Sequence, residues 1–231
     1  MNVLDVQEVS TSVGNTELIK DISFELKAGA IMALVGHNGA GKSTLIKTIM
    51  GIQEKSQGKI VIQEKYDQDE QFVKFKRLIA YLPEEPLLLT ELTVIQHFQL
   101  YGISYGLSEE ELQIRIERYV KGFELTDKLN EYPESLSKGM RQKVQTICAL
   151  LPNVPILLID EPFMGLDIYA IDYLVDLIRE KSQEGTSILL TTHQLERIKK
   201  IASEFMMLQN GTLLNEGKIE TFDTILRGSI K

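Results

Sequence analysis

Short apolar runs alternate with longer amphipathic runs along this chain. Residues 31–35 ("IMALV"), 155–160 ("PILLID") and 186–193 ("TSILLTTH") each contain a short continuous apolar run, which is typical of strands buried on both faces. Amphipathic runs after the first two predict helices, at 42 to about 49 and at 168–185. Short apolar strands that alternate with helices predict an α/β fold with a largely parallel sheet.

The beginning of the chain has a different pattern. Polar and apolar residues alternate there, which favours antiparallel strands and predicts an N-terminal antiparallel β subdomain. A turn is expected at Gly14–Asn15, and a hairpin is expected on Asn210–Gly211 near the other end of the chain. Four further strands are expected, at 2–9, 21–26, 58–65 and 79–82.

Residues 84–150 are rich in helix signals. The segment 108–123 is amphipathic, and Ser108 with Glu111 three residues later has the spacing of a capping box. We expect an inserted helical subdomain at 84–150. The chain, 1–231, is then a single domain whose α/β core consists of 1–83 and 151–231.

Composition and charge narrow the classes of protein. The 231 residues carry a net charge of -8, which argues against nucleic acid as a partner because phosphate binding needs clustered Lys and Arg. Cys148 is the one cysteine, so an internal disulfide is excluded. The N-terminus lacks the features of a signal peptide, and no apolar run reaches the roughly 18 residues of a membrane span. We expect a soluble protein that can still dock on a membrane protein.

A phosphate-binding loop is predicted between the strand at 31–35 and the helix after it. "GHNGAGKST" fits the pattern G-x-x-x-x-G-K-[ST] in the strand–loop–helix context that this pattern requires. Backbone N–H groups and Lys42 would bind phosphate oxygens, and the Ser43 hydroxyl would bind Mg²⁺. The predicted nucleotide-binding residues here are Gly36, His37, Asn38, Gly39, Ala40, Gly41, Lys42, Ser43 and Thr44.

Two further apolar strands end in polar residues. Asp160 and Glu161 follow "ILLI", and His193 closes the strand at 186–193. Ligands bind at the carboxyl edge of parallel sheets. Asp160 would therefore hold Mg²⁺ through its waters, Glu161 would polarise an attacking water, and His193 would contact a γ-phosphate. A strand that ends in solvated acids and a histidine that serves as a surface or capping residue remain open alternatives.

The segment "ESLSKGMRQK" at 134–143 predicts a second helix N-terminus, with Ser137 as N-cap. Together with the preceding motifs it resembles the ATP-binding subunit of an ABC transporter, over essentially the whole chain. "LSKGM" resembles the signature usually written LSGGQ, and "GLD" at 165–167 resembles the D-loop. The resemblance implies that two copies pair head to tail, so that Ser137 and Gly139 of one copy contact the ATP on the phosphate loop of the other.

The chain departs from the family pattern at several positions. Lys138 and Met140 replace the Gly and Gln of the signature. Glu84 stands at the glutamine of the Q-loop, where its carboxylate can bind Mg²⁺ or water but cannot donate a hydrogen bond when ionised. Val13 stands where an aromatic residue usually stacks on adenine, which implies weaker contact with the base.

The finer pattern is similar to that of ABC-2-type exporters, and most similar to the ATPase subunits of Ecs-type exporters. This implies ATP hydrolysis that powers export, of small peptides in related members, through a separate membrane permease subunit at the cytoplasmic face of the membrane. Leu87, Leu88 and Leu89 are candidates to receive a short helix of that subunit, although we expect two of the three to pack inside.

Two alternatives remain open for the function. One is a soluble ABC ATPase outside transport, of the type that serves iron–sulfur assembly. The other is a regulatory module that binds nucleotide without turnover, which Val13 and Glu84 favour. The presence of Lys42, Asp160, Glu161 and His193 argues against this second alternative.

Overall fold

Two β-sheets organise the computed structural model, which describes residues 1–223. The strands are β1 (Asn2–Val13), β2 (Thr16–Lys27), β3 (Ile31–Val35), β4 (Gln57–Ile62), β5 (Tyr66–Asp67), β6 (Ile79–Leu82), β7 (Ile156–Asp160), β8 (Ser187–Thr191), β9 (Glu204–Gln209) and β10 (Thr212–Lys218). The helices are α1 (Lys42–Ile49), α2 (Phe72–Lys76), α3 (Val94–Ser104), α4 (Glu109–Gly122), α5 (Lys138–Leu150), α6 (Ile168–Gln183) and α7 (Leu195–Ile198), with short 3-10 turns at Thr126–Lys128, Pro133–Ser135 and Ile219–Thr221.

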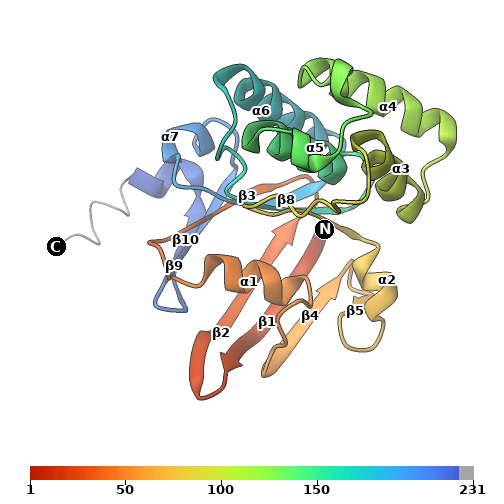
Figure 1. Ribbon diagram of the computed structural model, residues 1–231. Coiled ribbons are helices and arrows are strands. Elements are labelled where there is room, and N and C mark those ends of the chain that lie inside the picture. Colours follow the sequence, from red (N-terminus) through yellow and green to blue (C-terminus); the bar gives the residue numbers. More distant parts are fainter. Residues whose placement is uncertain (224–231) are drawn as a thin grey trace.

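The larger sheet has six strands in the order β10-β9-β3-β8-β7-β6 (Figure 1). All of its strand pairs are parallel except β9 with β10. That antiparallel pair turns on Asn210 and Gly211, whose φ angles of 48° and 79° suit a tight hairpin. The predicted largely parallel sheet and the predicted hairpin are both confirmed. The residues that follow β3, β7 and β8 therefore meet at one edge.

Successive residues of the central strands enter two different hydrophobic cores. In β3, Ile31, Ala33 and Val35 pack in one core, and Met32 and Leu34 pack in the other. The same alternation holds in β7 and β8. Because successive side chains of a strand point to opposite faces, a sheet covered on both faces needs apolar residues at every position. This is the physical reason for the continuous apolar runs of the sequence.

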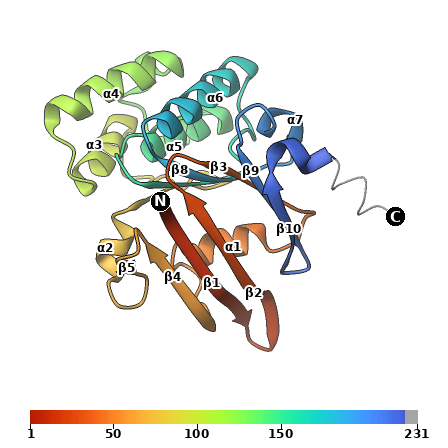
Figure 2. The same ribbon diagram turned by 180° about the vertical axis from the view of Figure 1, so that it is seen from behind.

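Different elements cover the two faces of the large sheet. Helices α3 to α6 lie on one face, and α1 with the four-stranded sheet β2-β1-β4-β5 lies on the other (Figure 1). The view from behind shows β1 and β2 in front of α1, which packs between the two sheets (Figure 2). Leu45, Ile46 and Ile49 of α1 are completely buried there. The N-terminus of α1 is thereby held beside the edge at which β3 ends.

Strands β1 and β2 are longer than the alternating pattern predicts, although the turn at Gly14–Asn15 is confirmed. Ser10 and Thr11 are polar, yet both are buried in β1. The Ser10 hydroxyl accepts a hydrogen bond from the Asp21 N–H (2.8 Å), and the Thr11 and Thr48 hydroxyls lie 3.0 Å apart in a hydrogen bond. These hydrogen bonds let polar side chains continue the strand inside the core.

The strand predicted at 58–65 ends early, at Ile62. Gln63 and Glu64 take positive φ angles, 53° and 56°, and turn the chain into β5. The sequence reading did not predict the short helix α2 that follows. Strand β6 has the predicted bounds. Strand β8 ends at Thr191, so the predicted strand was two residues too long and His193 lies just beyond it.

Residues 84–150 contain α3, α4 and α5. The capping box at Ser108 and Glu111 is confirmed: the Ser108 Oγ accepts from the Glu111 N–H and the Glu111 carboxylate accepts from the Ser108 N–H. An Arg118–Glu180 ion pair joins α4 to α6. No helix of the described part is both long and apolar enough to cross a lipid bilayer. Residues 224–231, the end of the expected second core segment, lie outside the described residues.

The three leucines after Pro86 alternate between solvent and core. Leu87 and Leu89 are 68% and 51% exposed, and Leu88 packs against the helical core. The expectation that two of the three pack inside was therefore wrong. An extended segment presents alternate side chains to one side, so a run of three leucines buries the middle one when its backbone is held against the helices.

Candidate functional site

The N-terminus of α1 is built as an anion site. Its N-cap is Gly41, with φ 104° and no side-chain cap. A helix begins with N–H groups that have no partner inside the helix, and a side-chain cap would normally satisfy one of them. Here they remain available to a phosphate, and the positive end of the helix dipole adds to the attraction.

The phosphate loop folds around Lys42. The Nζ atom of Lys42 donates hydrogen bonds to the carbonyl oxygens of Gly36 (2.8 Å) and His37 (3.2 Å). Gly36 passes so close to β9 that a Cβ atom there would lie 2.5 Å from the Leu208 carbonyl oxygen. Glycine is therefore required for the loop to close, and closure brings the positive charge of Lys42 inside it.

Asp160 and Thr191 face each other at the ends of β7 and β8. The Thr191 hydroxyl donates a hydrogen bond to Asp160 Oδ1 (2.6 Å) and accepts one from the Glu161 N–H (3.0 Å). Thr191 thus orients the Asp160 carboxylate and binds the backbone of Glu161, and the sequence analysis did not identify it. The signal that could have identified Thr191 is the threonine at the end of the apolar run in "SILLTTH", because this strand pairs with "ILLIDE".

Glu161 occupies an unusual backbone position. Its φ is 45°, a left-handed conformation that non-glycine residues seldom adopt, and its carboxylate is buried. Oε2 accepts a hydrogen bond from the His193 N–H (3.1 Å). Oε1 lies 3.2 Å from His193 Nε2 but without hydrogen-bond alignment, and it has no hydrogen-bond partner among the described residues. His193 and Glu161 are thus brought together as predicted.

The electrostatics of Glu161 suit a base. Burial raises the pKa of its carboxyl, and His193 and Lys42 oppose that shift without reversing it. A carboxylate with a raised pKa takes up a proton more readily, which helps it to polarise a water molecule. The His193 N–H binds Oε2, and Oε1 is unpaired but shielded from solvent beside His193.

One cavity of about 610 Å³ joins the phosphate loop to the acids. It is lined by Leu18, Asn38, Gly39, Gly41, Lys42, Ser43, Thr44, Glu84, Asp160, Glu161, Met164 and His193. Most of the predicted site residues therefore share one cavity, and the sequence reading missed Leu18 and Met164. A groove of about 670 Å³ beside Lys27 and Glu204 is slightly larger, but it holds none of these residues.

Some predicted nucleotide-binding residues lie outside the cavity lining. Ala40 is buried beneath the loop, and Gly36 and His37 contribute carbonyl groups to Lys42. Val13 is 55% exposed at the tip of β1, while Leu18 is the apolar side chain of β2 that lines the cavity. Contact of Val13 with a base stays a prediction.

Oxygen donors that suit magnesium line the same cavity. Ser43, Asp160 and Glu84 offer a hydroxyl and two carboxylates, which are the hard ligands that Mg²⁺ prefers. Asp160 Oδ1 is engaged by Thr191, so its other oxygen is the one that remains for a metal-bound water. The described part contains no cluster of three His, Cys, Asp or Glu side chains of the kind that holds a metal ion alone. The donor set fits an ion shared with phosphate oxygens and water.

The signature residues lie apart from this cavity. Ser137 caps α5, its Oγ accepting from the Met140 N–H (3.2 Å), as predicted. A Cβ atom on Gly139 would lie 2.6 Å from the Gly165 carbonyl oxygen, so the start of α5 packs tightly on the D-loop. Neither Ser137 nor Gly139 lines the cavity of Lys42.

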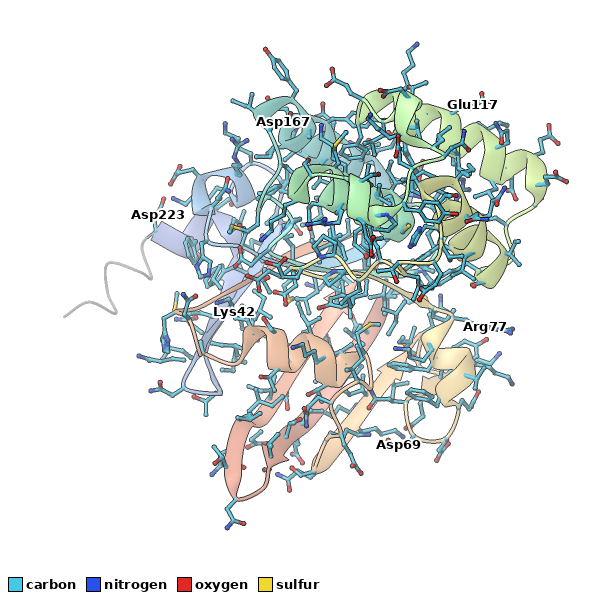
Figure 3. The ribbon with its side chains drawn as sticks, in the orientation of Figure 1. Lys42, Asp69, Arg77, Glu117, Asp167 and Asp223 are labelled. Carbon is cyan, nitrogen blue, oxygen red and sulfur yellow. The ribbon has the colours of Figure 1, made fainter. Side chains whose placement is uncertain are left out.

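An ion pair connects α5 to the D-loop. Lys143 Nζ lies 2.8 Å from Asp167 Oδ2, and this contact, with the Ala170 N–H, lowers the pKa of the Asp167 carboxyl. Asp167 lies above the large sheet at the start of α6, and Lys42 lies below it at the start of α1 (Figure 3).

Comparison with known proteins identifies the family. Residues 19–164 match the family model described as "ABC transporter". The "ABC-type transporter ATP-binding protein EcsA" of Bacillus subtilis (strain 168) is 35% identical, over 95% of this chain and 88% of the relative. The "SkfA peptide export ATP-binding protein SkfE" of the same organism is 28% identical, over 96% and 92%.

A solved structure described as "Structure of ATP binding subunit of ABC transporter" has a TM-score of 0.92 and 38% identity, and the match covers 98% of this chain and 95% of that one. The phosphate loop, the acids of β7 and the capped start of α5 are the motifs on which the family resemblance of the sequence rests. The chain belongs to the ABC transporter family, as an ATP-binding subunit with ATPase activity.

Proposed function

We propose that two copies of this chain close head to tail on two Mg–ATP and thereby drive export through a separate membrane subunit. The carrying observation is that the chain has two helix N-termini suited to anions, at Gly41 and Ser137, and that only the first opens into the cavity of Lys42. One nucleotide cannot contact both helix N-termini of the same chain. A second copy would bring its Ser137 and Gly139 to the γ-phosphate.

Each site residue has a role in hydrolysis under this proposal. The loop N–H groups and Lys42 hold the β- and γ-phosphates, and Mg²⁺, when bound, neutralises charge that develops on them. Ser43, Asp160 and Glu84 hold the ion directly or through water. Glu161 would orient and polarise the attacking water through its carboxylate, which the His193 N–H holds in place, and the His193 ring would contact the γ-phosphate.

The adenine base of ATP is expected to lie beside the β1–β2 hairpin. Leu18 lines the cavity and offers an apolar wall, and Val13 lies nearby on the exposed tip of the hairpin. Without an aromatic ring at either position, the base would be held by apolar contact rather than by stacking. This supports ATP binding with weak selection for the base.

An exposed apolar surface supports docking of a membrane subunit. Leu87 and Leu89 lie on the loop after β6, and Leu100 and Ile103 lie on the neighbouring helix α3; all four are exposed, between 42% and 73%. Exposed aliphatic side chains on a loop and on the helix that follows it suit a short helix of another protein. Docking there would place the chain at the cytoplasmic face of the membrane.

Export rather than import is inferred from one of these relatives and from the sequence resemblance to ABC-2-type exporters. SkfE is described as a peptide export ATP-binding protein, and it matches nearly the whole chain. Small peptides are therefore the substrate class to test first.

Co-isolation tests the proposal. The tagged protein is purified from detergent-solubilised membranes of its own cell, and its companions are identified by mass spectrometry. We expect a polytopic membrane protein in stoichiometric amount, and we expect Leu87→Asp with Leu89→Asp to release it. Ile114→Asp is the matched control, because Ile114 is 60% exposed on α4 outside this surface. Only soluble companions would overturn the proposal and favour an assembly-type ATPase.

A further inference from the structure

Two buried side chains hold the loop that carries the exposed leucines. The Leu87 N–H donates a hydrogen bond to Gln145 Oε1 (2.9 Å), and the Leu89 N–H donates one to His97 Nε2 (2.9 Å). Gln145 and His97 are each 1% exposed. Two alternate N–H groups of the loop are thus bound from the inside, which leaves the side chains of Leu87 and Leu89 in solvent.

The protonation of His97 follows from these contacts. Because the Leu89 N–H is a donor, His97 Nε2 must accept. The proton of the neutral ring is then on Nδ1, which lies 2.8 Å from the Thr93 carbonyl oxygen and donates to it. His97 therefore ties the end of the loop to the first turn of α3.

Gln145 ties the same loop to a different helix. It lies on α5, the helix that begins at the signature serine Ser137. Its Nε2 also reaches the hydroxyl of Tyr101 on α3, at 3.5 Å. A buried hydrogen bond thus connects the Leu87 backbone to the helix that carries the signature residues.

A second contact between α5 and the loop is weaker. Lys138 Nζ lies 2.8 Å from Glu85 Oε1, but both side chains are more than half exposed. Exposed ion pairs of this kind contribute little because water screens them. A buried N–H that loses its acceptor is more costly, so Gln145 is the stronger connection.

We propose that Gln145 and His97 are positioning residues that fix the shape of the Leu87–Leu89 loop, and that Gln145 makes this loop follow the signature helix. The identity of the docking partner rests on the proposed function, whereas the two hydrogen bonds do not. Movement of Ser137 toward a partner-held phosphate would then change the surface presented to the membrane subunit.

Amide exchange measured by NMR tests the two hydrogen bonds separately. Gln145→Leu should speed exchange of the Leu87 amide by about tenfold and leave the Leu89 amide nearly unchanged, and His97→Phe should do the reverse. Gln145→Glu keeps an acceptor of the same length and should retain protection at Leu87. Equal exchange in Gln145→Leu and Gln145→Glu would overturn the assignment of Gln145.

Coupling to the signature is tested in the Glu161→Gln background, in which Mg–ATP should hold the closed dimer. We expect Mg–ATP to change the exchange rate of the Leu87 amide in Glu161→Gln alone and in its combination with Gln145→Glu. In the combination with Gln145→Leu, we expect no change. All three proteins should form the dimer in size-exclusion chromatography. A response that survives in Gln145→Leu would overturn the transmission role.

A rate measurement separates this inference from the proposed function. With the co-isolated membrane subunit, Gln145→Leu should lose the stimulation of ATPase rate by that subunit while the rate of the isolated chain stays within about twofold, and Gln145→Glu should rescue it. A membrane subunit that stimulates both variants equally would refute the inference and leave the proposed function intact. If no membrane subunit is found, the proposed function fails and the amide exchange still decides the two hydrogen bonds.

Discussion

Helices α1 and α5 both begin with a serine- and glycine-containing segment next to a lysine, yet their N-termini are built differently. At α1 the N-cap is Gly41 and no side chain satisfies the first N–H groups, while Lys42 turns inward onto the loop carbonyls. At α5 the Ser137 hydroxyl already accepts from the Met140 N–H, and Lys138 turns outward to Glu85.

This difference separates a complete anion site from half of one. The N–H groups of α1, the charge of Lys42 and the acids of β7 surround one cavity, so the site can bind phosphate within a single chain. The capped start of α5 is stable by itself and lies apart from the cavity of its own chain. In the proposed dimer, it would gain a second use when another copy brings a phosphate to it.

The largest expected effect is on the α1 side. Glu161→Gln should reduce ATP turnover by about 10²–10⁴-fold, because the amide cannot act as a base, while ATP still binds and the dimer still forms. Steady-state phosphate release and size-exclusion chromatography with Mg–ATP measure both properties. Glu117→Gln, on the surface of α4 far from Lys42 (Figure 3), is the control and should retain wild-type turnover. An unchanged rate in Glu161→Gln would remove Glu161 from the mechanism.

The α5 side is tested by comparing two N-caps. Ser137→Ala and Ser108→Ala each remove a serine that caps its helix, so each should lose roughly 1 kcal/mol of unfolding free energy. Only Ser137→Ala should also weaken the ATP-dependent dimer, by roughly tenfold, because in the proposed dimer only Ser137 would meet a phosphate. Urea unfolding measures the free energy of unfolding, and sedimentation with Mg–ATP measures the strength of the dimer. Equal dimerisation by both variants would reduce Ser137 to a helix cap.

A smaller effect concerns the stability of the catalytic edge. Burial raises the pKa of Glu161 in the folded chain, so the folded state binds this proton more tightly than the unfolded state does. Stability contributed by this group therefore falls as pH rises from the unfolded pKa through the raised folded pKa. Glu161→Gln should then stabilise the chain at neutral pH, and the gain should vanish below the unfolded pKa. Thermal unfolding of both chains across pH checks the sign, and a gain that grows on acidification would contradict it.

The smallest expected effect concerns the contact with the adenine base of ATP. Val13→Tyr would supply the missing ring, and stacking should tighten ATP by about threefold to tenfold. Titration with ATP and with a nucleotide of another base measures affinity and selectivity. Val73→Tyr, also on an exposed residue but in α2, is the control. No gain for Val13→Tyr would mean that Leu18, not residue 13, forms the wall of the base site.

Much of this molecule was readable from local patterns. The phosphate loop, the parallel strands, the helix from Lys42 to Ile49 and the two capping serines follow from short-range rules, because a glycine-rich turn, a period of two or a serine cap acts over a few residues. In β1 a local rule was overridden by contacts with other elements. β1 continues past its polar residues because Asp21 and Thr48, distant in sequence, satisfy them.

The sequence by itself determined which chemical groups the chain carries and in which local structure each is held. Only the tertiary structure decided which of them share a cavity. Thr191 orients Asp160 because β7 and β8 pair in that register, Leu18 lines the cavity because β2 crosses beside α1, and Leu87 lies in solvent because Gln145, fifty-eight residues later, binds its N–H. Such contacts join residues far apart along the chain, and no local pattern encodes them, because their free energy exists only once both cores are packed.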